Sequence, residues 1–281
     1  MLNLNNYMKN CVILMHICTG DSFTMYACVC HYAKIYDMIY IFCMERNKEF
    51  IQQLYEKLNV NITIIPIEEH KKCKLGYAAP LSFIDKLMDV EDYNIIKTGQ
   101  SFEENAVHCN EWVELNKISK YFWRNFYKQA NLDYEIRYDY MDINRNLEKE
   151  KNFYDKIVEI YGKKYIFVHD HRIYSRDVKN GKFIRDLYLR EDIPVFHPNI
   201  NYYKEGHKFY DLWGENLISN NILDYGMIIE NAFIVDIIDS SFGCYCPYLK
   251  LDNVSKKIIR TGLNIVDYHN SYKNWQISKY V

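Results

Sequence analysis

The chain has 281 residues, of which 49% are hydrophobic and 26% are charged, and its formal net charge is −2. This length and apolar content predict one or two packed cores and exclude a mostly disordered protein. Because binding to a phosphate backbone needs clustered Lys and Arg, the scattered lysines argue against a nucleic-acid-binding surface.

The first half of the chain alternates between apolar runs and amphipathic segments. Four apolar runs predict strands, at 12–17, 38–43, 62–67 and 93–97. Three segments between or after them predict helices, at about 22–35, 47–58 and 110–130. The first three runs are continuous rather than alternating, which is typical of strands buried on both faces of a parallel sheet. The strand–helix–strand repetition therefore predicts an α/β domain with right-handed crossovers.

A second α/β unit is predicted in the other half. The polar stretch 133–146 is expected to cross between the domains, and a helix follows it at 147–161. Further strands are predicted at 165–168, 194–197, 233–238 and near 258–259. A helix is predicted at 222–232, and a short one leads toward Leu249. We expect two Rossmann-like parallel-sheet domains facing a cleft, at 1–140 and 141–265, with a helix at 266–281 that packs back across them.

The remaining composition bears on location and metal binding. No apolar run reaches the roughly 18 residues that a membrane span requires, and no signal peptide is recognised, so a cytoplasmic protein is expected. Several of the nine cysteines lie inside apolar runs and are expected to be reduced core residues. Neither Cys28/Cys30 nor Cys244/Cys246 has a second pair at zinc spacing, so no metal site is predicted. The 27 tyrosines fit either the codon bias of an AT-rich genome or an aromatic surface for stacking carbohydrates.

The first candidate site is the turn at Gly20 and Asp21, which follows the strand predicted at 12–17 and begins a helix. In open α/β sheets, ligands bind where a strand ends and the free N–H groups of a helix begin. Asp21 is interpreted either as the helix N-cap or as a carboxylate that contacts or deprotonates a substrate hydroxyl.

The second candidate site follows the strand predicted at 165–168 and reads His169, Asp170, His171 and Arg172. Arg172 suits bidentate contact with phosphate, and His169 suits donation to a diphosphate or positioning of a substrate. A plain surface loop and a metal site are the alternatives left open for this segment.

The third candidate site is the turn after the strand at 233–238, which reads Asp239, Ser240, Ser241 and Phe242. Two hydroxyls at a helix start either cap the helix or help to hold a phosphate. Glu230, on the preceding helix, is expected either to approach a ribose or to lie on the surface. The chain has no P-loop, no G-x-G-x-x-G and no G-x-S-x-G, so ATPase, Rossmann dehydrogenase and α/β-hydrolase interpretations lack their motifs.

These three segments, in this order, resemble motifs of two-domain GT-B glycosyltransferases. The turn from His16 to Asp21 resembles the H-x-G-x-G-D turn of heptosyltransferase-like members, with the first glycine replaced. The run from Val168 to Arg172 resembles the H-x-R-R motif of fucosyltransferase-type members, with one arginine matched. The run 238–242 resembles their later D-S-S-F motif. Most of the chain, in order, is similar to small predicted glycosyltransferases of large DNA viruses and bacteria.

The resemblance implies a nucleotide-diphosphate-sugar donor and a glycan or related acceptor. His169 and Arg172 would contact the diphosphate, beside Asp239, Ser240, Ser241 and Phe242. The acceptor would lie near His16, Gly20 and Asp21, with Asp21 as the general base if the reaction inverts. Such enzymes usually need no bound metal and no organic cofactor, and a viral member would act in the host cytoplasm.

Two alternatives remain at this stage. A catalytically inactive GT-B-like binding or structural protein would carry the same motifs without turnover, and a sugar-nucleotide epimerase would convert the donor without an acceptor. The donor base, the sugar, the acceptor, the stereochemical course and the oligomeric state are not set by the sequence.

Overall fold

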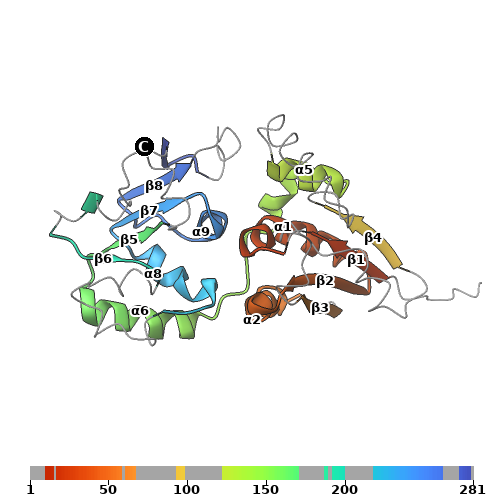
Figure 1. Cartoon of the computed structure of the whole chain (residues 1–281), viewed down its shortest axis with the longest axis horizontal. Coiled ribbons are helices and arrows are strands. Elements are labelled where there is room, and N and C mark those ends of the chain that lie inside the picture. Colours follow the sequence, from red (N-terminus) through yellow and green to blue (C-terminus); the bar gives the residue numbers. More distant parts are fainter. Residues whose placement is uncertain are drawn as a thin grey trace, which may run out of the picture. The chain divides into compact units, whose positions relative to one another are not determined.

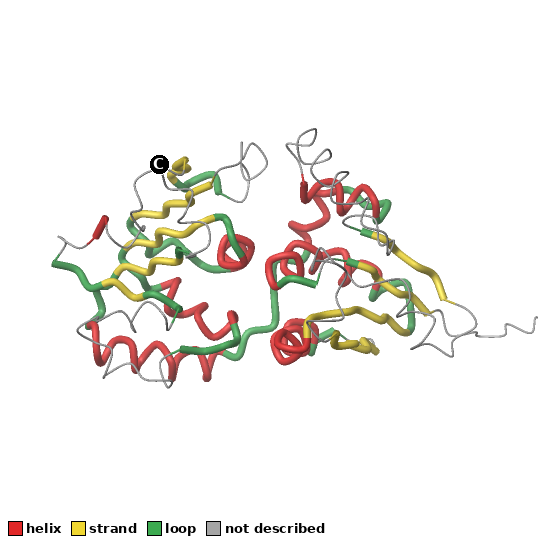
Figure 2. The backbone as a smooth tube through the Cα atoms, viewed as in Figure 1, coloured by secondary structure: helices red, strands yellow, loops and turns green. Residues whose placement is uncertain are grey.

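Two parallel β-sheets organise the chain, one in each of two units, Met1–Asn144 and Arg145–Val281 (Figures 1 and 2). The computed structural model describes residues 10–15, 17–58, 61–67, 93–98, 122–170, 187–188, 192–199, 218–261 and 272–279. The chain is therefore an α/β protein with two parallel sheets, compatible with two Rossmann-like units. None of the helices in these ranges is long and apolar enough to cross a membrane.

The sheet of unit 1 has four strands in the order β3-β2-β1-β4, and every neighbouring pair is parallel. Its strands are β1 (Asn10–Leu14), β2 (Met38–Met44), β3 (Asn61–Ile67) and β4 (Tyr93–Lys97). β1 is central and buried on both faces, because Val12 and Leu14 pack in one apolar cluster and Met15, just beyond the strand, packs in another. This double burial explains the continuous apolar runs.

The helices of unit 1 are α1 (Thr19–Tyr32), α2 (Lys48–Tyr55) and α5 (Phe122–Gln129), with 3-10 helices η1 (Glu45–Asn47) and η3 (Tyr134–Asp139). α1 packs against α5 and η3 through a cluster that includes Met25, Cys28, Phe126 and Tyr134. The buried hydroxyl of Tyr127 donates to the carbonyl of Thr24 at 2.6 Å. The stretch predicted as an interdomain crossing therefore supplies η3 to the core of unit 1.

The sheet of unit 2 has five strands in the order β6-β5-β7-β8-β9, again with parallel neighbours throughout. Its strands are β5 (Ile166–His169), β6 (Val195–Phe196), β7 (Ile234–Ile238), β8 (Lys256–Thr261) and β9 (Gln276–Lys279). Its helices are α6 (Leu147–Tyr161), α8 (Gly226–Glu230) and α9 (Ser241–Tyr245), with 3-10 helices η8 (Ile222–Tyr225) and η9 (Cys246–Tyr248).

The predicted C-terminal helix is wrong for residues 276–279, which form the edge strand β9. Ile258 to Thr261 of β8 pair in register with Gln276 to Lys279. The open edge of β8 offers backbone hydrogen bonds to the tail, and this long-range pairing overrides the helical spacing of its apolar residues. Residues 266–271 lie outside the described part of the chain.

Capping residues fix the ends of α6 where the sequence predicted them. The side-chain oxygen of Asn146 accepts the backbone N–H of Lys149 at 3.0 Å, which satisfies a donor in the first turn. Gly162 follows the last residue with a φ of 75°, a conformation that glycine adopts without a steric cost. α6 therefore begins and ends as its sequence specifies.

Candidate functional site

Polar side chains of unit 2 gather at the carboxyl ends of β5 and β7. His169 is the last residue of β5, and Asp239 and Ser240 follow β7 directly. β5 and β7 are parallel neighbours, with His169 in register with Ile237. The turn after β5 and the turn after β7 therefore lie together at the carboxyl-terminal ends of the strands, where open α/β sheets bind ligands. Below, the edge of a sheet in this functional sense means these carboxyl-terminal strand ends.

The structure joins the second and third candidate sites through a direct contact. The Nδ1 atom of His169 lies 3.0 Å from the hydroxyl oxygen of Ser240, and the imidazole packs on Phe242 with 4.6 Å between ring centroids. Ser240 is the N-cap residue of α9, but its side chain forms no capping hydrogen bond. Capping as the role of the Ser240 side chain is therefore wrong, because its hydroxyl is engaged by the imidazole.

A second histidine lies beside the first. The Nε2 atom of His197 is 2.8 Å from a carboxylate oxygen of Asp170, and both side chains are buried. The backbone N–H of Asn199 donates to Nδ1 of His197 at 3.1 Å. The backbone N–H of Asp170 also donates to Nε2 at 3.2 Å, so both ring nitrogens of His197 are engaged by the turns after β5 and β6. The rings of His169 and His197 are 6.1 Å apart between centroids.

Asp239 completes this group from the side of β8. Its backbone N–H donates to the carbonyl of Arg260 at 2.8 Å, and its carboxylate accepts the hydroxyl of Thr261 at 3.4 Å. We call the residues His169, Asp170, His197, Asp239, Ser240 and Phe242 the edge site. Ser241 begins α9 next to it and is half-buried.

For the segment from His169 to Arg172, a plain surface loop and a metal site were the alternatives to a substrate-binding turn. The loop alternative is wrong for Asp170, which is buried against His197. Among the described residues, no group of three or more His, Cys, Asp and Glu side chains could hold a metal ion. His171 and Arg172 lie outside the described part of the chain, so the role expected of Arg172 stays a prediction.

A buried ion pair that the sequence analysis missed supports the edge site from within the sheet. Asp236 of β7 is fully buried, and Arg260 of β8 donates to both of its oxygens, at 2.7 and 2.6 Å. The Tyr188 hydroxyl donates to the same carboxylate at 2.6 Å. Burial alone would lower the pKa of Arg260, but the carboxylate of Asp236 raises it overall, so the guanidinium stays charged. The only signal in the sequence was one Asp inside an apolar run.

Glu230 is placed elsewhere. It ends α8, before β7 begins, so it lies toward the opposite edge of the sheet from Ser240. Arg145 donates to both of its carboxylate oxygens, at 2.6 and 3.0 Å, and the backbone N–H of Lys250 donates at 2.9 Å. Arg145 also binds the buried carboxylate of Glu150, so Glu230 belongs to a structural ion-pair network and is not brought to the edge site.

In unit 1, the first candidate site lies in the first turn of α1. The N-cap of this helix is Cys18, so the N-cap interpretation of Asp21 is wrong. Burial raises the pKa of Asp21 to about 7 from an ordinary value of 3.8. Nearby, the Thr19 hydroxyl donates to the amide oxygen of Asn47 at 3.3 Å, which links α1 to the turn after β2.

Gly20 lies beside Asp21 in the same turn, and its carbonyl accepts the hydroxyl of Thr24 at 3.2 Å. His16 lies outside the described residues. Asp21, with a pKa raised by burial to about 7, thus lies in the helix turn that follows strand β1.

Comparison of the chain with protein-family models, with curated proteins and with solved structures returned no match.

Proposed function

We propose that this chain is a cytoplasmic glycosyltransferase of the GT-B type, which moves a sugar from a nucleotide-diphosphate-sugar to a hydroxyl of a glycan or related acceptor. The observation that carries the proposal is the contact between His169 and Ser240 at 3.0 Å. It brings two separate sequence motifs together at the edge where parallel sheets bind ligands. Both motifs resemble those that hold the donor in GT-B enzymes.

The edge site supplies groups suited to a diphosphate. A leaving diphosphate develops negative charge, which fixed hydrogen-bond donors and cations stabilise most when they are held in place beforehand. His169 and Ser240 hold each other in place, and Ser241 adds a second hydroxyl. We assign the positive charge to Arg172, since a guanidinium binds phosphate oxygens in a bidentate manner.

Asp21 is proposed as the base on the acceptor side. In an inverting reaction, the acceptor oxygen forms a bond to the anomeric carbon and its proton passes to Asp21. The bond from that carbon to the diphosphate oxygen breaks, and the electron pair leaves with the nucleotide. A general base works best when its pKa is near the working pH, and burial raises the pKa of Asp21 to about 7.

Release of nucleotide from a donor panel tests the proposal. The panel holds UDP-, GDP-, ADP- and TDP-linked sugars and a CMP-linked sugar, each with and without a mixture of glycan acceptors. We expect release from one nucleotide class, lowered about 100-fold or more by Asp21→Asn and about tenfold by Ser240→Ala. Ser255→Ala is the matched control, because its hydroxyl binds the Phe233 carbonyl before β8 begins.

Three outcomes would contradict this account. Nucleotide binding without release would indicate the inactive binding protein, and conversion of the donor without an acceptor would indicate the epimerase. Release that Ser240→Ala and Asp21→Asn leave unchanged would place the chemistry at another site.

A further inference from the structure

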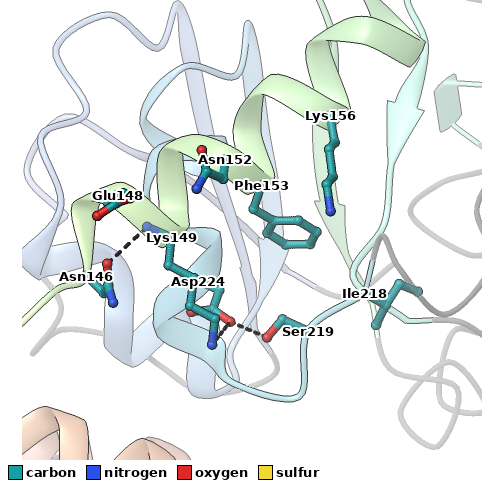
Figure 3. Close-up of a pocket in the computed structure, with 9 residues that line it drawn as sticks. All are labelled: Asn146, Glu148, Lys149, Asn152, Phe153, Lys156, Ile218, Ser219 and Asp224. Carbon is teal, nitrogen blue, oxygen red and sulfur yellow. Dashed lines mark hydrogen bonds and ion pairs between the residues drawn. The ribbon is translucent and has the colours of Figure 1, made fainter.

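A polar pocket beside α6 shares no residue with the edge site (Figure 3). Its volume is about 470 Å³, and it is lined by α6 together with Asp224 of η8 and the two residues Ile218 and Ser219. This volume is within the range of about 300–1,000 Å³ that is usual for small-molecule sites. The pocket therefore has room for a ligand with the size of one or two sugar rings.

One buried carboxylate in this pocket is only half satisfied. Asp224 is 2% exposed. Its Oδ2 atom accepts the hydroxyl of Ser219 and lies 3.0 Å from the ammonium group of Lys149, as Figure 3 shows. Its Oδ1 atom is buried and has no hydrogen-bond partner among the described residues. Such an oxygen carries a desolvation cost, which a ligand hydroxyl donating to it would relieve.

The charges around the pocket balance. The described lining residues include two lysines, Lys149 and Lys156, and two carboxylates, Glu148 and Asp224, of which Lys149 and Asp224 form an ion pair. The charges of the described lining residues therefore cancel, so these residues select neither an anion nor a cation. What it offers is a mixture of hydrogen-bond donors and acceptors, to which Asn152 adds an amide with both.

The pocket also has an apolar wall. Phe153 projects from α6 toward the segment that carries Ile218 and Ser219 (Figure 3). Tyr225 holds the Phe153 ring in an edge-on contact with 5.3 Å between centroids. A neutral ligand with many hydroxyls and one C–H face matches such a lining, because the hydroxyls both donate and accept while the C–H face covers the ring.

We propose that this pocket binds a neutral saccharide. When the Asp224 carboxylate turns toward the pocket, one sugar hydroxyl donates to it. Asn152 and Lys156 donate to other sugar oxygens, and the C–H face of the ring lies against the exposed margin of Phe153. This is a second carbohydrate site, apart from the donor and acceptor positions of the proposed transfer reaction. It does not require the chain to be an active enzyme.

Ligand-observed and protein-observed NMR titration of the full chain tests the proposal. The probes are the methyl glycosides of glucose, galactose, mannose, N-acetylglucosamine and fucose, with inorganic phosphate as the anionic comparison. We expect at least one glycoside to bind at millimolar concentration. Asn152→Ala and Lys156→Ala should each raise its Kd about three- to tenfold, the value of one hydrogen bond.

Both substitutions are at exposed positions of α6, so the fold is expected to be kept. Lys151→Ala is the matched control, since Lys151 is an exposed lysine of the same helix that pairs with Asp155 and does not line the pocket. It should leave the Kd unchanged.

Binding of phosphate but of no glycoside would overturn the proposal, as would no binding by any probe. Glycoside binding that neither Asn152→Ala nor Lys156→Ala weakens would also overturn it. The two proposals can fail independently, because nucleotide binding is expected to depend on Ser240, whereas glycoside binding in this pocket is expected to depend on Asn152 and Lys156.

Discussion

The carboxyl edges of the two sheets differ in how their polar groups are held. In unit 2, His169 is bound to Ser240, His197 to Asp170 and Asp239 to Thr261, so side chains after different strands fix one another. In unit 1, Asp21 lies in the first turn of α1 with a pKa raised to about 7. The polar side chains of unit 2 therefore hold one another in place, as the proposed donor site requires, whereas the proposed role of unit 1 depends on the raised pKa of one carboxyl group.

The largest expected effect comes from breaking the ion pair beneath the edge site. Asp236→Ala leaves Arg260 largely buried and without its carboxylate, so we expect unit 2 to lose about 3–5 kcal/mol of stability in urea unfolding. The double variant Asp236→Leu with Arg260→Met removes both charges and should recover most of this loss. A single variant that unfolds like the wild type would show that β7 and β8 do not depend on the pair.

The next effect is the pH dependence of the stability of unit 1, which Asp21 causes. Because its pKa is raised, the Asp21 carboxyl stays protonated in the folded protein at pH values where it is already ionised in the unfolded chain. The free energy of unfolding therefore falls as the pH rises from about 4 to about 7. Asp21→Asn should therefore be more stable than the wild type at pH 8, by on the order of 4 kcal/mol, and equally stable at pH 3. Thermal unfolding across this pH range measures it. Parallel curves for the two proteins would mean that Asp21 titrates normally.

A smaller effect contrasts the hydroxyls at the two edges. Ser240→Ala should raise the Kd for the preferred nucleoside diphosphate about tenfold, because a donor to a charged phosphate is lost. Thr19→Val, which removes the corresponding hydroxyl near Asp21, should leave that Kd unchanged, since unit 1 is not expected to hold the nucleotide. Isothermal titration gives both values. An equal rise in Kd in the two variants would contradict the proposal that unit 2 alone holds the nucleotide.

The smallest effect concerns the interiors, where the units are alike. The hydroxyl of Tyr127 in unit 1 donates to the Thr24 carbonyl, and that of Tyr165 in unit 2 donates to the Ile228 carbonyl, both at 2.6 Å. Each Tyr→Phe substitution should cost about 1 kcal/mol in urea unfolding. A much larger loss of unfolding free energy in one variant would show that the two units also differ in their interiors.

Local patterns in the sequence predicted most of the elements. The continuous apolar runs marked β1 and β2 because strands buried on both faces need apolar residues at nearly every position. The run of β3 also marked a strand, but its predicted burial on both faces is wrong, since β3 lies at the end of the sheet and only Ile67 is fully buried. α6 lies at its predicted bounds, and its ends coincide with Asn146 and Gly162, residue types that end helices. The strand β9 was missed because an edge strand depends on its neighbour rather than on its own residues.

The candidate site was predicted in part, and its contacts were not. The strand ends pointed to His169 and Ser240, since ligand sites follow the topology of the sheet. The pairs His197–Asp170 and Arg260–Asp236 join residues far apart in the sequence, and no local period marks such partners. Glu230 was expected near a ribose because it precedes β7, but that position is also where it meets Arg145.

The most direct test of the central claim is thermal unfolding with GDP, UDP, ADP, TDP and CMP, for the wild type, His169→Ala, Arg172→Ala and Ser255→Ala. A nucleotide at about 100 times its Kd stabilises the folded state by roughly 2.7 kcal/mol, a rise in Tm of several degrees for a chain of this size. We predict such a rise for one nucleotide, kept in Ser255→Ala and lost in the other two variants. No rise with any nucleotide, or a rise that His169→Ala and Arg172→Ala both retain, would contradict a donor site at the edge of unit 2.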